Sequence, residues 1–334
     1  MIERGDYRPK IIIDGSGTER DVSPEKFRPI PVPENTIVFP DKKEVVVDWR
    51  RTFEKITEIT RDINAAEIVQ DEGIYQPVIT HPRLKWAMGI NFSDPHIGSY
   101  TSDHELIRDI LDITLNIPHS FIVDTGDTFN NGIWGGLAYE DIIPPYLQAF
   151  TIEDMARELG DKYAACVIGN HPEWMFTDAG IKPEFMFARL IKGPIFPGMG
   201  LLHLDIGGQK YDWALAHDYW GKTKKNIFNV CINLRQNEYP NADIFSVGHE
   251  HIWGFGTEKI DERVVGYIRP GTAKLIDRYA RIHGIARRGQ AMGMAVLFRT
   301  DKKEFEIKPI DKAVAFMKEQ MVLAGYEGAS SSTV

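Results

Sequence analysis

The chain has 334 residues, and 43% of them are hydrophobic, which suffices for one large core or for two domains. Its formal net charge of −9 gives the protein as a whole no general attraction to nucleic acid. No apolar run approaches the roughly 18 residues that a membrane span needs, and the charged N-terminus lacks the apolar stretch of a signal peptide. We therefore expect a cytoplasmic protein that does not enter a membrane.

Residues 1–82 predict an N-terminal appendage made of an extended arm and a helix. Five prolines lie between residues 24 and 40, which suits an extended arm and argues against an independent core. Apolar residues then recur at helical spacing from about Asp48 to Gln70. We expect this helix to pack on the main domain, with docking of a partner as the alternative.

Residues 83–311 alternate apolar runs with helix-like segments, a pattern typical of α/β domains. Five buried strands are predicted, at Trp86–Phe92, Phe121–Val123, Ala164–Ile168, Trp213–Leu215 and Ile244–Val247. Each is followed closely by a polar fragment, in turn Asp94-Pro95-His96, Gly126-Asp127, Gly169-Asn170-His171, Ala216-His217-Asp218 and Gly248-His249-Glu250-His251. Because such sheets bind ligands beyond the carboxyl ends of their strands, we expect the fragments to converge on one rim. A helix at Lys312–Leu323 and a flexible tail complete residues 312–334.

The residue types in these fragments predict a metal site. Asp94 and His96 lie two apart at a strand end, as do His249 and His251, so strand geometry would point each pair the same way. Carboxylate, imidazole and amide ligands together suit Mn, Fe or Zn, and the two isolated cysteines exclude a thiolate zinc site. The candidate ligands are Asp94, His96, Asp127, Asn170, His217, His249 and His251. They are enough for two ions roughly 3.5–4 Å apart that share a carboxylate. We expect Mn, with Fe, Zn or Mg as alternatives.

The order of the fragments resembles that of the calcineurin-like metallophosphoesterase superfamily. Its blocks Asp-x-His, Gly-Asp, Gly-Asn-His, His and Gly-His-x-His occur here in the same order between residues 94 and 251. The resemblance implies a mixed α/β fold, a two-sheet β-sandwich flanked by helices. It assigns one metal to Asp94, His96, Asp127 and His251 and the other to Asp127, Asn170, His217 and His249, with Asp127 as the bridge. It also implies that His171 is catalytic, facing the scissile phosphate as leaving-group acid or charge stabiliser.

One position departs from the family pattern. Many members carry a second Asp shortly after the Gly-Asp block, which in some branches orients the histidine of Gly-Asn-His; here that position is Asn130. An amide fixes an imidazole ring but does not raise its pKa as a carboxylate would. Glu173 and Asp178 are alternative partners for His171.

Two further features bear on the substrate. Between residues 263 and 288 there are seven basic residues and one acidic residue, Asp277, which gives a net charge of +6. The basic residues include Arg269, Arg278 and Arg281. This basic strip is interpreted as a track for a nucleic-acid backbone, with a solvated helix face as the alternative. Trp174, Trp220 and Trp253 each follow a histidine of the blocks by two or three residues. They would stack on bases, at about 1–3 kcal/mol each, or else pack around the site and exclude water.

These features lead to one prediction and its alternatives. We predict a two-metal-dependent phosphodiesterase, with a nuclease acting on DNA or RNA as the leading interpretation. The run Arg269-Pro270-Gly271-Thr272 resembles a step in SbcD-type nucleases of the same superfamily, which favours that interpretation. The alternative is a phosphatase or nucleotide phosphodiesterase acting on a small molecule. A metal-free scaffold is disfavoured because every ligand position is filled.

Overall fold

The computed structural model describes residues 71–132, 139–179, 191–275 and 292–326, together with Phe53 and two short strands near the N-terminus. The chain divides into two compact units, Met1–Asp62 and Ile63–Val334. In the first unit, β1 (Ile12–Ile13) pairs antiparallel with β2 (Glu19–Arg20). Apart from Phe53, which is helical, the helix expected at 48–70 lies outside the described residues, as does the tail after residue 326.

The second unit contains two six-stranded sheets in its described residues. The β9 sheet consists of β3 (Glu72–Tyr75), β8 (Met199–Ile206), β9 (Gln209–Ala216), β10 (Ile244–Val247), β11 (Trp253–Ile260) and β12 (Arg263–Pro270), in the order β11-β12-β10-β9-β8-β3. The β4 sheet consists of β4 (Trp86–Phe92), β5 (Ser120–Asp124), β6 (Tyr163–Ile168), β7 (Ile195–Pro197), β13 (Met294–Arg299) and β14 (Phe305–Pro309), in the order β14-β13-β4-β5-β6-β7. The described helices are α2 (His104–Asn116), α3 (Pro145–Leu159), α4 (Asn170–Ala179), α6 (Asn229–Asn237) and α8 (Ile310–Ala324). A short 3-10 helix, Gly160–Lys162, follows α3.

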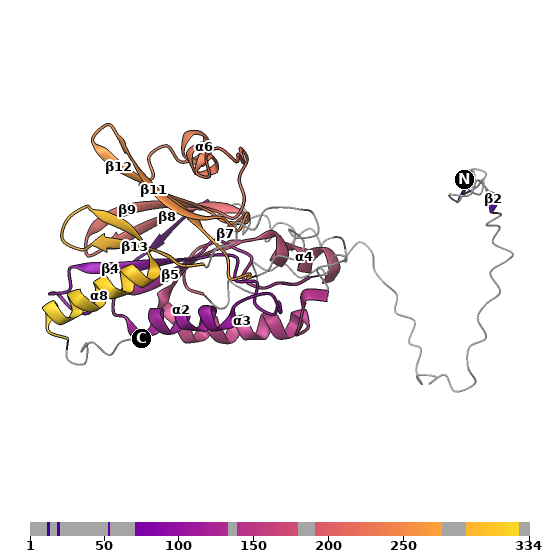
Figure 1. Cartoon of the computed structure of the whole chain (residues 1–334), viewed down its shortest axis with the longest axis horizontal. Coiled ribbons are helices and arrows are strands. Elements are labelled where there is room, and N and C mark those ends of the chain that lie inside the picture. Colours follow the sequence, from indigo (N-terminus) through magenta and orange to yellow (C-terminus); the bar gives the residue numbers. More distant parts are fainter. Residues whose placement is uncertain are drawn as a thin grey trace. The chain divides into compact units, whose positions relative to one another are not determined.

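The two sheets pack face to face around an apolar layer (Figure 1). The ring of Phe298 lies 6.1 Å from that of Phe121, in the same sheet, and 6.0 Å from that of Trp213 in the other sheet. The indole of Trp213 donates to the Ser246 hydroxyl at 2.7 Å, so its polar atom is satisfied in the core. Every residue of β4, β5 and β6 is buried, which explains why these strands read as continuous apolar runs.

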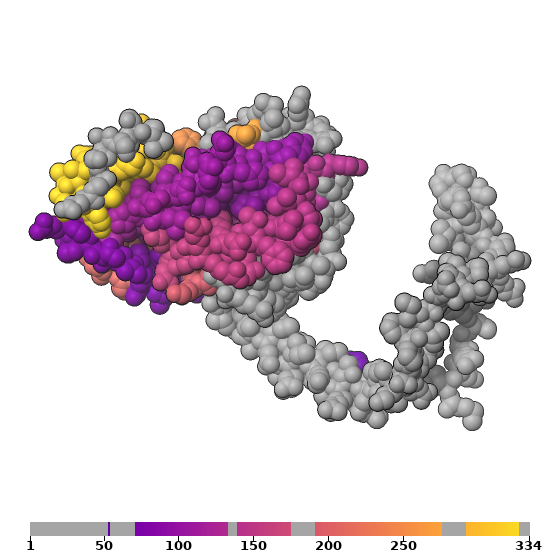
Figure 2. Space-filling model, turned by 90° about the horizontal axis from the view of Figure 1, so that it is seen from below, coloured from indigo at the N-terminus to yellow at the C-terminus, as the bar shows by residue number. Residues whose placement is uncertain are grey.

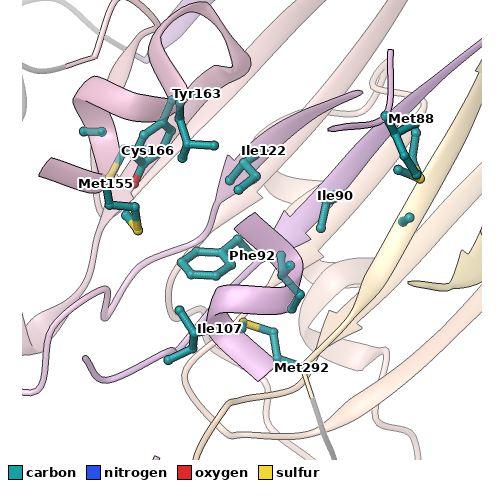
Figure 3. Packing of buried hydrophobic residues seen from close by; sticks show 14 of the residues in the cluster. Met88, Ile90, Phe92, Ile107, Ile122, Met155, Tyr163, Cys166 and Met292 are labelled. Atoms are coloured by element: carbon teal, nitrogen blue, oxygen red, sulfur yellow. The ribbon is translucent and has the colours of Figure 1, made fainter. Parts of the chain in front are cut away.

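Helices cover the outer faces of the sandwich. Helices α2, α3 and α8 pack on the β4 sheet, and α6 packs on the β9 sheet. Figure 3 shows Phe92 of β4 beside Ile107 of α2 and Met292, in the apolar layer between the β4 sheet and its helices. The face covered by α2, α3 and α8 is turned toward the viewer in Figure 2. This two-sheet sandwich with flanking helices confirms the expected fold class.

Strand β3 and helix α8, which lie at the two ends of the described part of the second unit, both pack with the sandwich. Strand β3 lies before residue 83 yet pairs in parallel with β8, with Glu72 opposite Leu201. Its residues alternate between exposed and half-buried positions at the sheet edge, so they form no apolar run. Helix α8 begins at Ile310 and packs on β13 and β4, which makes it part of the same compact unit. No helix in the described ranges is long and apolar enough to cross a membrane.

His119, which precedes β5, is held as a neutral ring inside the fold. Its Nε2 accepts hydrogen bonds from the backbone N–H groups of Thr80 (3.0 Å) and His81 (3.2 Å), so its Nδ1 carries the proton and donates to the Trp86 carbonyl at 3.3 Å. Burial lowers the pKa of His119 below its ordinary value. In the unfolded chain the ring takes up a second proton near pH 6.5, whereas in the folded protein it does so only at a lower pH. The contribution of His119 to stability is therefore fully present above pH 6.5 and is lost as the pH falls.

We expect His119→Asn to lower the denaturation midpoint most at pH 7.5 and least at pH 5.5. Asparagine suits the left-handed backbone at this position, where φ is 57°, but leaves the partly buried N–H groups of Thr80 and His81 without their acceptor, at a cost of about 0.5–1.5 kcal/mol. His203→Asn is the matched control. Although burial lowers the pKa of His203, Asp212 and Glu72 raise it above the ordinary value, so that variant should lose most at low pH. A pH-independent effect of His119→Asn would contradict a neutral, buried ring.

Candidate metal centre

The five polar fragments meet at one rim of the sandwich. Strands β4, β5 and β6 run parallel in one sheet, and β9 and β10 run parallel in the other, so their carboxyl ends lie together. The side chains that follow these ends form three contiguous groups, Asp94–His96–His251, His96–Asp127–His171 and Asp127–His217–His249. Asn170 joins the third group through its Oδ1, which lies 3.0 Å from His217 Nε2.

The first group lies after β4 and β10. The Nε2 atoms of His96 and His251 are 3.1 Å apart. Asp94 Oδ1 lies 3.4 Å from His251 Nε2 and 4.0 Å from His96 Nε2. Asp94 and His96 are 0% and 1% exposed, so these atoms face one another inside the protein.

The third group lies after β5, β9 and β10 and shares its carboxylate with the second group. Asp127 Oδ2 is 3.2 Å from His217 Nε2, which in turn is 3.2 Å from His249 Nδ1. The same Asp127 Oδ2 is 3.8 Å from His171 Nε2. Asp127 therefore stands between the two outer groups, the position that a bridging carboxylate needs.

The backbone that presents these side chains is not strand, contrary to the period-two expectation. Asp94 and His96 lie beyond the end of β4 with φ of 49° and 47°, and His249 and His251 have φ of 67° and 55°. Left-handed conformations are uncommon for residues other than glycine and collect at functional sites. Backbone hydrogen bonds stabilise the left-handed conformations of Asp94 and His96, since Asp94 N donates to the Gly126 carbonyl (2.9 Å) and His96 N to the Asp127 carbonyl (3.1 Å).

Two glycines of the fragments are required by close approach. Gly126 has φ of 106°, and a Cβ there would lie 2.5 Å from His217 Nδ1. A Cβ at Gly169 would lie 2.2 Å from Asp127 Oδ1. A side chain at Gly126 would displace the His217 ring, and one at Gly169 would displace the Asp127 carboxylate, which explains why glycine precedes Asp127 and Asn170.

The donor set fits divalent metal ions. Ligands about 2.1 Å from one ion lie roughly 3.0–3.4 Å apart in octahedral or tetrahedral shells, close to the separations within both outer groups. Asp94 Oδ1 is buried, and its charge partners among the described residues are the imidazoles of His251 (3.4 Å) and His96 (4.0 Å), whereas Oδ2 accepts from the Ser93 hydroxyl and from His249 N. Because buried charges are paired or coordinate metals, a buried carboxylate oxygen that faces two imidazoles is well placed to bind a cation. The clusters are thus consistent with a binuclear divalent metal site, without indicating which metal.

Charge pairing within the groups agrees with this fit. Burial alone would raise the pKa of Asp127, but His217 and His171 hold it below its ordinary value. Burial alone would lower the pKa of His217, but Asp127 and Asp94 raise it to about 10. A divalent ion would replace the proton that His217 shares with Asp127, so binding should release protons.

His171 is oriented by a backbone carbonyl, which corrects the expectation for Asn130. The Nδ1–H of His171 donates to the Asn130 carbonyl, and the Asn130 side chain instead donates to Asp141 at 2.8 Å. Glu173, the proposed substitute, is exposed, and the side chain of Asp178 lies outside the described residues. The Nε2 atom of His171 is consequently the one that faces Asp127 and His96.

The three tryptophans differ in environment, and their expected contacts with substrate stay predictions. Trp174 is half-buried, with its ring centroid 4.2 Å from that of His171 at an interplanar angle of 35°. Trp253 is half-buried at the start of β11 and meets Phe255 edge-on. Trp220 is 62% exposed. Trp174 therefore packs on His171, and Trp220 presents the most exposed ring of the three, 6.0 Å from that of Tyr219.

Arg269, expected to contact substrate, lies behind the last fragment instead. It is 1% exposed, donates to the Ile227 and Gly248 carbonyls at 3.0 and 3.1 Å, and forms an ion pair with Glu250 at 2.9 Å. The guanidinium thus supports the turn that carries His249 and is not presented to solvent.

The other basic residues of the strip that the structure describes, Arg263 and Lys274, do not share a surface with Arg269. Arg263 begins β12, at the end opposite the rim, and donates to the Pro240, Asn241 and Ala242 carbonyls. Lys274 is buried against Glu140. Arg278 and Arg281 lie outside the described residues. The described members of the strip are therefore engaged within the protein.

Some supporting residues had no role assigned from the sequence, although Thr272 lies in the run 269–272 noted there. Asn131 donates from its side chain to the His171 carbonyl at 2.9 Å, and its N–H donates to the buried side chain of Gln148, also at 2.9 Å. Thr272 donates its hydroxyl to the Asp94 carbonyl at 2.8 Å. These residues lie far apart in the chain, so only the fold brings them to the site.

Comparisons with known proteins find only remote structural similarities. The sequence matches no protein-family model and no curated protein. A metallophosphoesterase from Sphaerobacter thermophilus is 16% identical with a TM-score of 0.37, over 73% of this chain and 96% of that one. A calcineurin-like phosphoesterase from Bacillus subtilis is 11% identical with a TM-score of 0.35, over 72% and 96%. Vacuolar Protein Sorting 29 from Cryptosporidium parvum is 14% identical with a TM-score of 0.34, over 67% and 97%. Identities and TM-scores this low do not transfer residue roles from those proteins, so the chemistry of the site rests on this chain's own side chains.

Proposed function

We propose that this chain is a metal-dependent phosphoesterase that hydrolyses phosphodiester bonds. The observation that carries the proposal is the Asp127 carboxylate between two ligand groups, one with Asp94, His96 and His251 and the other with His217 and His249. Two divalent ions bound there would supply positive charge to the phosphoryl oxygens and activate the attacking water. Such a carboxylate bridge is typical of two-ion hydrolytic sites.

His171 is the proposed proton donor to the leaving group. The Asn130 carbonyl fixes the Nδ1–H of His171, so His171 Nε2 is the atom that would donate a proton to the leaving oxygen. Burial lowers the pKa of His171, although Asp127 raises it, so Nε2 releases a proton readily but carries one in a smaller fraction of molecules near neutral pH. Trp174, whose ring is tilted by 35° against that of His171 at 4.2 Å, would restrict the rotation of the imidazole.

The substrate class is the finer part of the proposal. A nucleic-acid substrate would depend on the remaining arginines of the strip, which include Arg278 and Arg281, because Arg269 and Lys274 are buried in ion pairs. That engagement favours the alternative, a small nucleotide or other small phosphate ester, held by the exposed Trp220 ring. Mn is our proposed metal, because imidazole, amide and carboxylate donors are mixed at the site.

The test of the proposal is hydrolysis by protein whose metal content has been measured. Protein carrying two Mn ions per chain should hydrolyse bis-p-nitrophenyl phosphate, lose the activity with a chelator and regain it with Mn. Single-stranded DNA, duplex DNA, RNA, a dinucleotide and p-nitrophenyl phosphate, assayed in parallel, separate the substrate classes. Absence of hydrolysis of every ester by protein with two bound ions would refute the proposed function.

A charge reversal addresses the nucleic-acid alternative directly. If the strip tracks a backbone, Arg278→Glu with Arg281→Glu should weaken binding to oligonucleotides and flatten its salt dependence, because fewer counterions are released. Hydrolysis of bis-p-nitrophenyl phosphate should hardly change. The matched control reverses Lys312 and Lys318 on α8, which alters net charge equally on the helical face. Equal binding by both double variants and the parent would favour the small-molecule substrate.

A further inference from the structure

The loop that carries Asp94 and His96 is clamped on one side by residues 139–142. We call residues 93–102 the metal loop. Tyr100 N donates to the Glu140 carbonyl at 2.9 Å, and Ile142 N donates to the Gly98 carbonyl at 2.8 Å. Ser99 and Asp141 form an isolated antiparallel bridge between these hydrogen bonds. This side of the metal loop therefore pairs like a short strand with residues 139–142.

Residues 271–275 clamp the other side of the metal loop. The Asp94 carbonyl accepts from the Thr272 hydroxyl at 2.8 Å and from Ala273 N at 3.2 Å. Further along, Leu275 N donates to the Thr101 carbonyl at 2.8 Å. Both ends of the metal loop are thus fixed by a segment that follows β12, far away in sequence.

A buried ion pair ties the two clamping segments to each other. Lys274 Nζ lies 2.9 Å from Glu140 Oε2, and the two side chains are 3% and 1% exposed. Removing both charges from water costs free energy that their attraction seldom recovers fully, so such pairs are a weak source of stability. Within the described residues, Glu140 Oε1 also has no hydrogen-bond partner. The pair is therefore better explained by the geometry it enforces than by the stability it adds.

We propose that Glu140 and Lys274 are positioning residues, whose ion pair closes the two clamps around the metal loop and thereby sets Asp94 and His96 for metal binding. The inference rests on the proposed function, since it assumes that Asp94 and His96 are ligands. It goes beyond that function by assigning part of the metal affinity to residues that touch neither metal nor substrate. Residues that orient ligands in this way typically change metal affinity about 10–100-fold when mutated.

The decisive variant is Lys274→Met with Glu140→Gln, which removes both charges and avoids leaving one of them unpaired. Metal affinity is measured by competition with a chelator, and folding by thermal unfolding with chelator in excess. We expect the affinity for one of the two Mn ions to fall about 10–100-fold while the other ion stays bound. Lys274→Arg, which keeps the charge, should retain most of the affinity. For bis-p-nitrophenyl phosphate, kcat at limiting metal should fall in the double variant and recover at high Mn with KM unchanged.

Lys303→Met is the matched control. Lys303 pairs with the buried carboxylate of Asp243 at 3.0 Å, and Asp243 precedes β10, at the end of the strand opposite the rim. This variant should change the unfolding temperature and leave both metal affinities as in the parent. A folded double variant that binds both ions with parental affinity would overturn the inference. Failure of the proposed function is distinguishable, because the parent would then bind two ions and hydrolyse no ester.

Discussion

Asp127→Asn is expected to abolish hydrolysis and to reduce the bound metal below two ions per chain. The Asp127 carboxylate faces His217 at 3.2 Å and belongs to two of the three ligand groups, so both ions depend on it. An amide is neutral and offers one weaker oxygen, and its N–H₂ would point a donor at a cation. Metal analysis after gel filtration, together with the rate on bis-p-nitrophenyl phosphate, measures both effects.

The control for this variant removes a carboxylate elsewhere. Asp161→Asn alters a side chain that is 60% exposed and pairs with Lys192, and it should keep two ions and the parental rate. The far-ultraviolet spectrum and unfolding midpoint of Asp127→Asn should show a folded protein. Two tightly bound ions in a folded Asp127→Asn protein that still turns over would show that the carboxylate is no bridge.

The convergence of the fragments was predictable because it follows from strand direction. Parallel strands end at the same edge of a sheet, and β4, β5 and β6 are buried on both faces, so their apolar runs are plain in the sequence. Asp94, Asp127 and Asn170 follow these runs directly. Their convergence therefore needed no knowledge of loop geometry, although the left-handed turns at Asp94 and His96 were not foreseen.

The environment of the charged residues was not predictable from local composition. Arg263 and Arg269 are only six residues apart in the sequence. An extended strand rises about 3.3 Å per residue, so β12 places them roughly 20 Å apart. Lys274 reads as one more member of a basic run, whereas its partner Glu140 lies 134 residues away. Burial of a charge depends on such long-range pairing, which a single sequence does not display.

The partner of His171 shows a third kind of limit. The sequence draws attention to the side chain at position 130, because side chains are what a sequence encodes. The bond is made by the backbone carbonyl of Asn130, which every residue possesses, while its amide is turned toward Asp141. The loop conformation alone decides which atom faces the ring, so no substitution pattern at this position would have revealed it.

His171→Ala is expected to keep both metal ions and to lose about 10²–10⁴ in rate, the usual scale for a general acid. The loss should be smaller for bis-p-nitrophenyl phosphate than for a dinucleotide, because p-nitrophenolate leaves without a proton. Trp174→Phe is a useful companion, since it preserves an aromatic neighbour while loosening the packing on the ring. Its effect should be much smaller than that of His171→Ala and independent of the leaving group.

Metal content decides between two roles for His171. Its Nε2 lies 3.8 Å from Asp127 Oδ2, and it shares a ligand group with His96 and Asp127, so distance alone allows it to be a ligand. The Nδ1 bond to the Asn130 carbonyl is compatible with either role, because it leaves Nε2 available to a proton or to a metal. A leaving-group acid should therefore leave the metal stoichiometry of the Ala variant at two and show the leaving-group dependence. Metal loss as large as that of Asp127→Asn, with an equal rate loss on both esters, would make His171 a ligand instead.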